Sequence, residues 1–89
     1  MLVNPKWTVK HVVGFDGAPL TRGDLPSGSG RWTARKKATV VISVQNGLIT
    51  LEEVCDRYSL TPGEYFEWAR AFERSGLRGL RTTHIRTTP

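Results

Sequence analysis

The sequence predicts a mainly α-helical fold that contains a helix-turn-helix and follows an extended N-terminal arm, which has room for a short β-hairpin. Two capping boxes follow one another in the middle of the chain, and apolar residues recur at helical spacing behind each box. Residues 1–30, by contrast, show almost no helical periodicity. With 89 residues the chain has the size of one small domain.

The first thirty residues are expected to form an arm rather than part of a core. Residues 8–13 can form a short strand, and Asp16-Gly17 is a turn signal, so the arm can hold a small hairpin. Residues 25–30 are rich in Ser and Gly, which leave the backbone free, and they predict a flexible linker.

Residues 34–46 allow two interpretations. As a helix, the segment places small and apolar residues on one face and ends at Gly47, a common C-terminal stop. As a strand, the β-branched run of residues 39–44 is followed by Asn46-Gly47 and a second apolar run, which is the strongest short-range signal for a hairpin. Local propensity does not decide between the two.

Two further helices are predicted by the capping boxes. Thr50 with Glu53 forms the first box and Thr61 with Glu64 forms the second. Pro62 stands at the first helical position after the second box, where its missing N–H costs nothing.

The residues behind the boxes form two apolar stripes. The stripes are Leu51, Val54, Cys55 and Tyr58, then Tyr65, Trp68, Ala69 and Phe72. We expect the second of these helices to end at Gly76. A short helix, a turn of about three residues and a longer helix have the spacing of a helix-turn-helix, although a plain helical hairpin has the same pattern.

An ordered series of short motifs runs from His11 to Thr83. The motifs are Gly14-Phe15-Asp16-Gly17, Leu20-Thr21, Asp24-Leu25-Pro26, Arg31-Trp32, Arg35-Lys36-Lys37-Ala38, Gly47-Leu48, Leu51-Glu52-Glu53, Arg57-Tyr58, Leu60-Thr61, Trp68 and Gly79-Leu80-Arg81-Thr82-Thr83. In this order they resemble the SciP family, small alphaproteobacterial proteins that inhibit the cell-cycle response regulator CtrA. The resemblance implies a small three-helix core related to Trp-repressor-like helix-turn-helix folds, and therefore a helix over residues 40–45.

The resemblance also implies an activity and a division of the chain. The implied activity is transcriptional regulation, through DNA contact, through binding to the response regulator, or both. We expect an arm and linker in residues 1–30, a helix-turn-helix domain in 31–80 and a basic tail in 81–89, with the three helices within about residues 32–76. The terminal residues 1–8 and 84–89 are expected to be mobile, because they hold few apolar residues.

Positive charge is concentrated in two parts of the chain. The net charge is +5 and the isoelectric point is about 10.0, which is common in proteins that bind a polyanion. Residues 31–46 hold four Lys and Arg and no acid, and residues 76–89 hold three Arg and no acid. The residues between these two segments carry more acids than bases.

The basic cluster of Arg35, Lys36 and Lys37 falls in the first turns of the first helix. A helix N-terminus carries partial positive charge, so each cation there is unfavourable by a few tenths of a kcal/mol. We expect the three side chains to be exposed and to meet an anionic partner, either DNA phosphate or an acidic protein surface. A solvated charged face is the alternative interpretation.

The last predicted helix has the position of a recognition helix. Projection at about 100° per residue places Gly63, Glu67, Arg70 and Arg74 opposite its apolar stripe. Arg70 and Arg74 can reach a base edge or a phosphate, whereas Glu67 can accept from cytosine but repels phosphates. The candidate DNA- or partner-binding residues are therefore Arg31, Arg35, Lys36, Lys37, Thr61, Gly63, Glu67, Arg70, Arg74, Arg78 and Arg81.

Other residue types argue against further kinds of site. The sequence has two His far apart, one Cys and no phosphate-binding glycine loop. We therefore expect neither an enzyme nor a protein that binds a metal or cofactor. Cys55, Trp32, Phe66 and Trp68 are expected to be core residues. The expected partners are double-stranded DNA and a CtrA-like response regulator, with no membrane and no small-molecule substrate.

The expected location is the cytoplasm, with nucleoid association when the protein is bound to DNA. The first hypothesis is a helix-turn-helix DNA-binding transcriptional regulator of the cell-cycle inhibitor type. The alternative is a protein-interaction module that binds the response regulator and blocks activation without base recognition.

Overall fold

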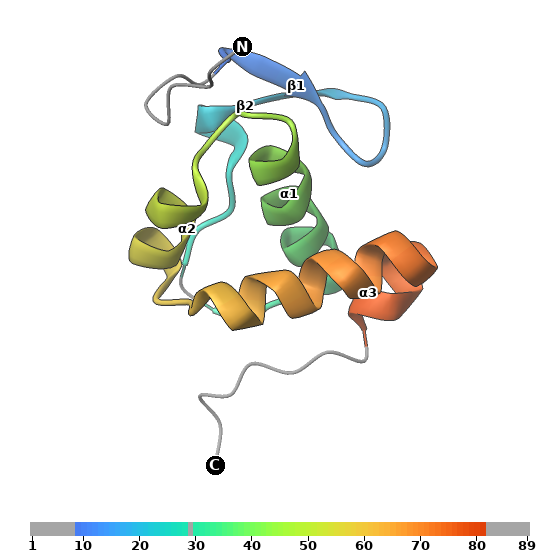
Figure 1. Cartoon of the computed structure of the whole chain (residues 1–89). Coiled ribbons are helices and arrows are strands. Elements are labelled where there is room, and N and C mark those ends of the chain that lie inside the picture. Colours follow the sequence, from blue (N-terminus) through green and yellow to red (C-terminus); the bar gives the residue numbers. More distant parts are fainter. Residues whose placement is uncertain (1–8, 29, 82–89) are drawn as a thin grey trace, which may run out of the picture.

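A hairpin and three helices make up the fold, as the sequence predicts. The computed structural model describes residues 9–28 and 30–81. In Figure 1 the hairpin lies at one end of α1 (Ala34–Gln45), and α3 (Pro62–Leu80) crosses the other end, with α2 (Leu51–Tyr58) at the side. The predicted mobility of the chain ends, and the part of the basic tail beyond Arg81, lie outside the described residues.

The hairpin pairs β1 (His11–Val13) with β2 (Pro19–Thr21). The two strands are antiparallel, and Val12 lies opposite Leu20. The turn is where Asp16-Gly17 predicts it: Gly17 has a φ of 85°, and the Asp16 carboxylate accepts a hydrogen bond of 3.1 Å from the Ala18 N–H.

The expectation that the N-terminal arm stays outside the core is wrong for residues 9–28. Val12, Leu20 and Leu25 are buried in the same apolar cluster as the helices. The Tyr58 hydroxyl on α2 donates a hydrogen bond of 2.7 Å to the Pro26 carbonyl, which ties the linker to the helices as well. Buried and exposed residues alternate along each strand, and this alternation could have predicted the burial of Val12 and Leu20. Each strand has only three residues, which is too short for the alternation to be recognised in the sequence.

The segment with two interpretations is the helix α1. Thr33 caps its first turn, and Gly47 follows its last turn with a φ of 85°. Val40 and Val41 are fully buried. Burial of these side chains on a helix therefore outweighs the β-propensity of the run, which is a weak preference.

The first capping box forms only in part. The Thr50 hydroxyl accepts a hydrogen bond of 3.1 Å from the Glu53 N–H, as predicted. The Glu53 carboxylate does not return to Thr50 but forms an ion pair with Arg22, just after β2. The same guanidinium donates a hydrogen bond of 3.1 Å to the Leu48 carbonyl, so Arg22 joins the hairpin to the start of α2.

The helix α3 reverses direction near its end. Gly76 has a φ of 62° and a ψ of −146°, a conformation that only glycine adopts without strain. The helix is therefore interrupted at Gly76, where the sequence predicts its end, but one more helical turn follows and extends to Leu80. That turn packs closely on α3, because a Cβ atom on Gly79 would lie 2.4 Å from the Ala71 carbonyl oxygen.

Candidate nucleic-acid interface

The turn between α2 and α3 has the three residues that the spacing predicts. Ser59 ends α2 in the left-handed conformation, with a φ of 56° and a ψ of 42°. Leu60 is buried, and its N–H donates a hydrogen bond of 3.0 Å to the Cys55 carbonyl. Thr61 then caps α3, which leaves in a different direction from α2 (Figure 1).

The outer face of α3 carries the four predicted recognition residues. Gly63, Glu67, Arg70 and Arg74 are all exposed. We use the term outer face for these residues together with Phe66. The expectation that Phe66 belongs to the core is wrong, because its side chain is 47% exposed.

The position of Phe66 follows from the rotation of α3 about its axis. Glu64 and Ala71 are buried beside Trp68, so the inward side of the helix differs from the one that the apolar stripe predicts. At about 100° per residue, the buried residues Glu64, Tyr65, Trp68 and Ala71 define an inward side to which Phe66 lies almost opposite. Tyr65 fills the core and its ring packs against that of Phe66, with centroids 5.3 Å apart.

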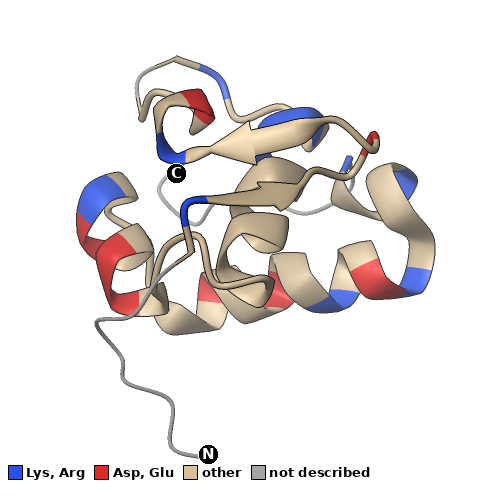
Figure 2. Cartoon of the chain, turned by 90° about the horizontal axis from the view of Figure 1, so that it is seen from above, with Lys and Arg blue, Asp and Glu red and all other residues tan. Residues whose placement is uncertain are grey.

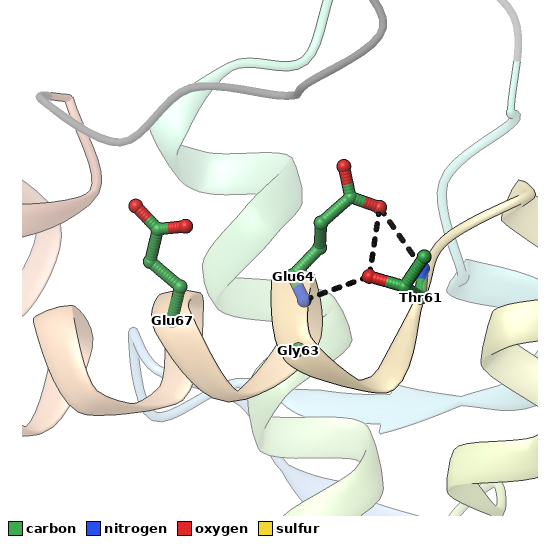
Figure 3. A pocket seen from close by; sticks show the side chains of 4 residues that line it. All are labelled: Thr61, Gly63, Glu64 and Glu67. Atoms are coloured by element: carbon green, nitrogen blue, oxygen red, sulfur yellow. Dashed lines mark hydrogen bonds between the residues drawn. The ribbon is translucent and has the colours of Figure 1, made fainter.

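A hollow of about 480 Å³ lies at the beginning of α3 (Figure 3). The second capping box forms in full here: the Thr61 hydroxyl accepts from the Glu64 N–H, and the Glu64 carboxylate accepts from the Thr61 N–H. The hollow is lined by Thr61, Gly63, Glu64 and Glu67, and Figure 3 shows both carboxylates on the same side of the helix. Two carboxylates repel a phosphate, so this end of α3 suits cationic or neutral groups.

The basic cluster at the start of α1 does not act as one surface. The Arg35 guanidinium lies over the Phe15 ring, 5.3 Å from its centroid, and Lys36 donates a hydrogen bond of 3.1 Å to the Arg31 carbonyl. Both side chains line a hollow of about 320 Å³ between the helix and the hairpin turn. Sequence reasoning missed Phe15 as the support for Arg35, because nothing in the local pattern pairs residues 20 positions apart.

Two carboxylates share this hollow with the two cations. Asp16 and Asp24 also line it. Hydrogen bonds from the Thr21 backbone and hydroxyl lower the pKa of the Asp24 carboxyl, which therefore remains charged. An anion in this hollow would be attracted by Arg35 and Lys36 but repelled by Asp16 and Asp24.

The expectation that Lys37 is exposed is wrong. Its side chain is 4% exposed and its ammonium donates a hydrogen bond of 3.2 Å to the Leu80 carbonyl. The ammonium also lies over the Trp68 ring, 5.6 Å from its centroid. Burial lowers the pKa of Lys37, and the charge of Glu67 opposes this shift. Lys37 therefore joins α1 to the end of α3 and is withdrawn from any surface.

The remaining predicted cations meet where α1 begins and α3 ends. A third hollow, of about 510 Å³, brings Arg31 and Arg81 together, with the buried Lys37 and Leu80 in its wall. Arg78 lies in the last turn of α3 and is exposed. We call Arg31, Arg35, Lys36, Arg78 and Arg81 the basic end.

Acidic residues gather on the other side of the molecule. Glu52, Glu53 and Asp56 lie on α2, and Figure 2 shows them apart from the basic residues at the far end of α3. Along α3 Glu64 and Glu67 come first, and Arg70, Arg74 and Arg78 follow with one acid, Glu73, among them. The C-terminal half of α3 and the basic end are therefore the part of the described surface that attracts an anion.

The described residues offer little for other chemistry. In residues 9–28 and 30–81 no three His, Cys, Asp or Glu side chains are grouped to hold a metal ion. Cys55 is half-buried, and burial together with the charge of Glu64 raises the pKa of its thiol. No helix in the described part of the chain is long and apolar enough to cross a membrane.

Comparison with known proteins shows the family. Residues 4–88 match the family described as "Protein of unknown function (DUF1153)". One similar solved structure is the NMR structure of a Rhodobacter sphaeroides protein, structural-genomics target RhR5. The two sequences are 36% identical, and the structures have a TM-score of 0.68 over 88% of this chain and 92% of that one. The NMR structure of target SiR5 is 32% identical with a TM-score of 0.53, over 86% and 90%. No curated protein matches the chain. The chain therefore belongs to the DUF1153 family, and its fold is like that of these two solved structures.

Proposed function

We propose that the protein is a helix-turn-helix transcriptional regulator that binds double-stranded DNA, of the SciP-like kind that inhibits a cell-cycle regulator. The supporting observation is the position of Arg70 and Arg74 on the exposed second helix of the motif, next to the basic end. An exposed helix with outward arginines is the part of a helix-turn-helix that enters the major groove.

In this proposal the two groups of cations have different roles. Arg70 and Arg74 contact base edges, where Arg to guanine is the commonest specific contact. The basic end contacts phosphates and fixes the orientation of the protein on the duplex. The phosphates of the duplex lie nearer the C-terminal half of α3, because Glu64 and Glu67 repel phosphates at its beginning. Such a protein acts in the cytoplasm and associates with the nucleoid while bound.

The alternative is a protein-interaction module that binds a CtrA-like response regulator without base recognition. One observation favours it: Glu52, Asp56 and Glu67 are exposed on α2 and the first half of α3. A carboxylate-rich surface suits the basic face of a DNA-binding protein and repels DNA itself. In this case the protein blocks activation by covering the regulator.

Binding to a fluorescent promoter duplex, with and without a purified CtrA-like response regulator, separates the two functions. DNA recognition predicts saturable binding without the regulator, weakened by salt and by Arg70→Ala. The alternative predicts that the protein joins the duplex only when the regulator is present. In that case Arg70→Ala has little effect, and Glu52→Lys with Asp56→Lys abolishes binding to the regulator. Absence of binding to duplex without the regulator overturns the first proposal.

A further inference from the structure

Phe66 is the one large apolar side chain on the outer face of α3. It is 47% exposed, and the other exposed large apolar residues of the described chain, Val9 and Val13, lie on or beside the hairpin. The residues three and four positions from it on the helix are Pro62, Gly63, Ala69 and Arg70, of which Pro62 is exposed and Ala69 half-buried. Phe66 therefore has the small Pro62 ring as an exposed apolar neighbour, but no second large apolar side chain is exposed beside it.

This setting matches the chemistry of the major groove better than that of a protein partner. A protein docking site on a helix presents several apolar residues together. The major groove instead presents single pyrimidine C5-methyl groups among hydrogen-bonding base edges, and Phe is one of the side chains that contact them. Arg70 stands one turn after Phe66 and supplies the hydrogen-bonding part of such a contact.

We propose that Phe66 and Arg70 together recognise a pyrimidine C5-methyl group close to a guanine in the major groove, which rests on the proposed DNA binding. The Phe66 ring packs on the methyl group, and the Arg70 guanidinium donates to guanine O6 and N7. Gly63, one turn before Phe66, has no side chain to hold the helix away from the groove.

The geometry of the helix limits where the two bases lie. Four residues advance an α-helix by about 6 Å, and successive bases on a strand are about 3.4 Å apart. The methyl group and the guanine therefore lie within about two base pairs of each other. The methyl group belongs either to thymine or to 5-methylcytosine, which present it at the same place in the groove.

Base replacement in a bound duplex tests this contact. A duplex is first selected from a randomised pool with the wild-type protein. Each thymine is then replaced by uracil, which removes only the methyl group, and each cytosine by 5-methylcytosine, which adds one. At one position the wild-type protein should bind the duplex lacking the methyl about fourfold more weakly, the effect of burying one methyl-sized group. Phe66→Ala should bind the two duplexes equally.

The variants distinguish the possible outcomes. Phe66→Leu should retain part of the discrimination, and Val13→Ala, which removes an exposed apolar side chain from the hairpin, should retain all of it. Equal binding of methylated and unmethylated duplexes by the wild-type protein overturns the contact and leaves DNA binding intact. Failure to select any duplex overturns the proposed DNA binding and the contact with it. Loss of binding to a response regulator in Phe66→Ala, without methyl discrimination in the wild type, assigns Phe66 to a protein interface instead and overturns the proposal.

Discussion

The Lys37 ammonium donates a hydrogen bond of 3.2 Å to the carbonyl of Leu80, 43 positions away in the sequence. This contact closes the fold, because it fastens the start of α1 to the turn that follows the reversal at Gly76. The three consecutive cations therefore differ in exposure: Arg35 is exposed, Lys36 is half-buried and Lys37 is buried. A cation that the charge pattern assigns to function therefore serves stability.

Replacing Lys37 should destabilise the protein, whereas replacing its neighbour should not. Lys37→Ala removes the hydrogen bond to Leu80 and the contact with the Trp68 ring, and we expect a loss of about 1–3 kcal/mol in the free energy of unfolding. Lys37→Met retains the apolar stem and should lose less. Arg35→Ala should change stability by less than about 0.5 kcal/mol. Urea unfolding measures all three, and a Lys37→Ala protein as stable as wild type contradicts the assignment.

The helices α2 and α3 were predictable because their signals are local, whereas α1 followed only from the family resemblance. Thr61, Pro62 and Glu64 form the full capping box that the sequence predicts, within a span of four residues. The capping box predicted at Thr50 forms only in part, because one of its two contacts is lost to a distant residue. The Glu53 carboxylate binds Arg22, a partner 31 positions away that no local pattern reveals.

The errors at the candidate site have the same origin. Lys37 is buried against Trp68 and Leu80 of α3, and the charge pattern of α1 alone does not predict contacts with another helix. Phe66 is exposed because Glu64 and Ala71 turn inward, and the choice between two adjacent aromatic residues depends on how α3 packs against α1. The exposure of Arg70 and Arg74 was predictable because both lie well away from either inward direction.

Two glycines of α3 should respond to alanine in opposite ways. Gly63 is exposed, and a Cβ atom there would meet its nearest neighbour at 3.8 Å, so Gly63→Ala should add about 0.5 kcal/mol through helix propensity. Gly79→Ala should destabilise by more than about 1 kcal/mol, because the Cβ atom would lie 2.4 Å from the Ala71 carbonyl oxygen. Thermal and urea unfolding of both variants check this, and a gain of stability in Gly79→Ala contradicts the close packing after Gly76.

Stability should fall at high pH because of Tyr65. Burial raises the pKa of its phenol to about 12, and an unfolded chain ionises it near pH 10. The unfolded state thus releases the proton first, so the contribution of Tyr65 is complete below pH 10 and is lost as the pH rises towards 12. The two-unit difference corresponds to about 2–3 kcal/mol.

Tyr65→Phe isolates this contribution. Phenylalanine fills the same space without a titrating group, so the decline between pH 10 and 12 should become shallower. Tyr58 and Lys37, whose pKa values are also shifted by burial, are unchanged in the comparison. Urea unfolding of both proteins at several pH values gives the two slopes, and identical slopes contradict the role of Tyr65.

Arg70→Ala should affect sequence preference more than general affinity for DNA. If its guanidinium contacts guanine, the variant loses about 1–3 kcal/mol on the selected duplex and tolerates a base change at that position. Glu73→Ala alters an exposed position on the same helix and is the matched control. Competition binding with selected and altered duplexes measures the preference. Equal loss on both duplexes makes Arg70 a phosphate contact instead.

The salt dependence of duplex binding tests the central claim, that the basic end contacts DNA phosphates. Arg35→Ala with Lys36→Ala removes two cations from the basic end. Lys10→Ala with Arg57→Ala removes two positive charges from elsewhere. Lys10 follows Val9, whose N–H donates a hydrogen bond of 2.9 Å to the carbonyl of Gly47 just after α1, and Arg57 lies on α2. Each phosphate contact contributes about 0.9 to the slope of log affinity against log salt concentration. The first pair should reduce the slope by about 2, and the second should leave it unchanged. Equal slopes for the two double variants would contradict the claim, because the effect would then reflect net charge alone.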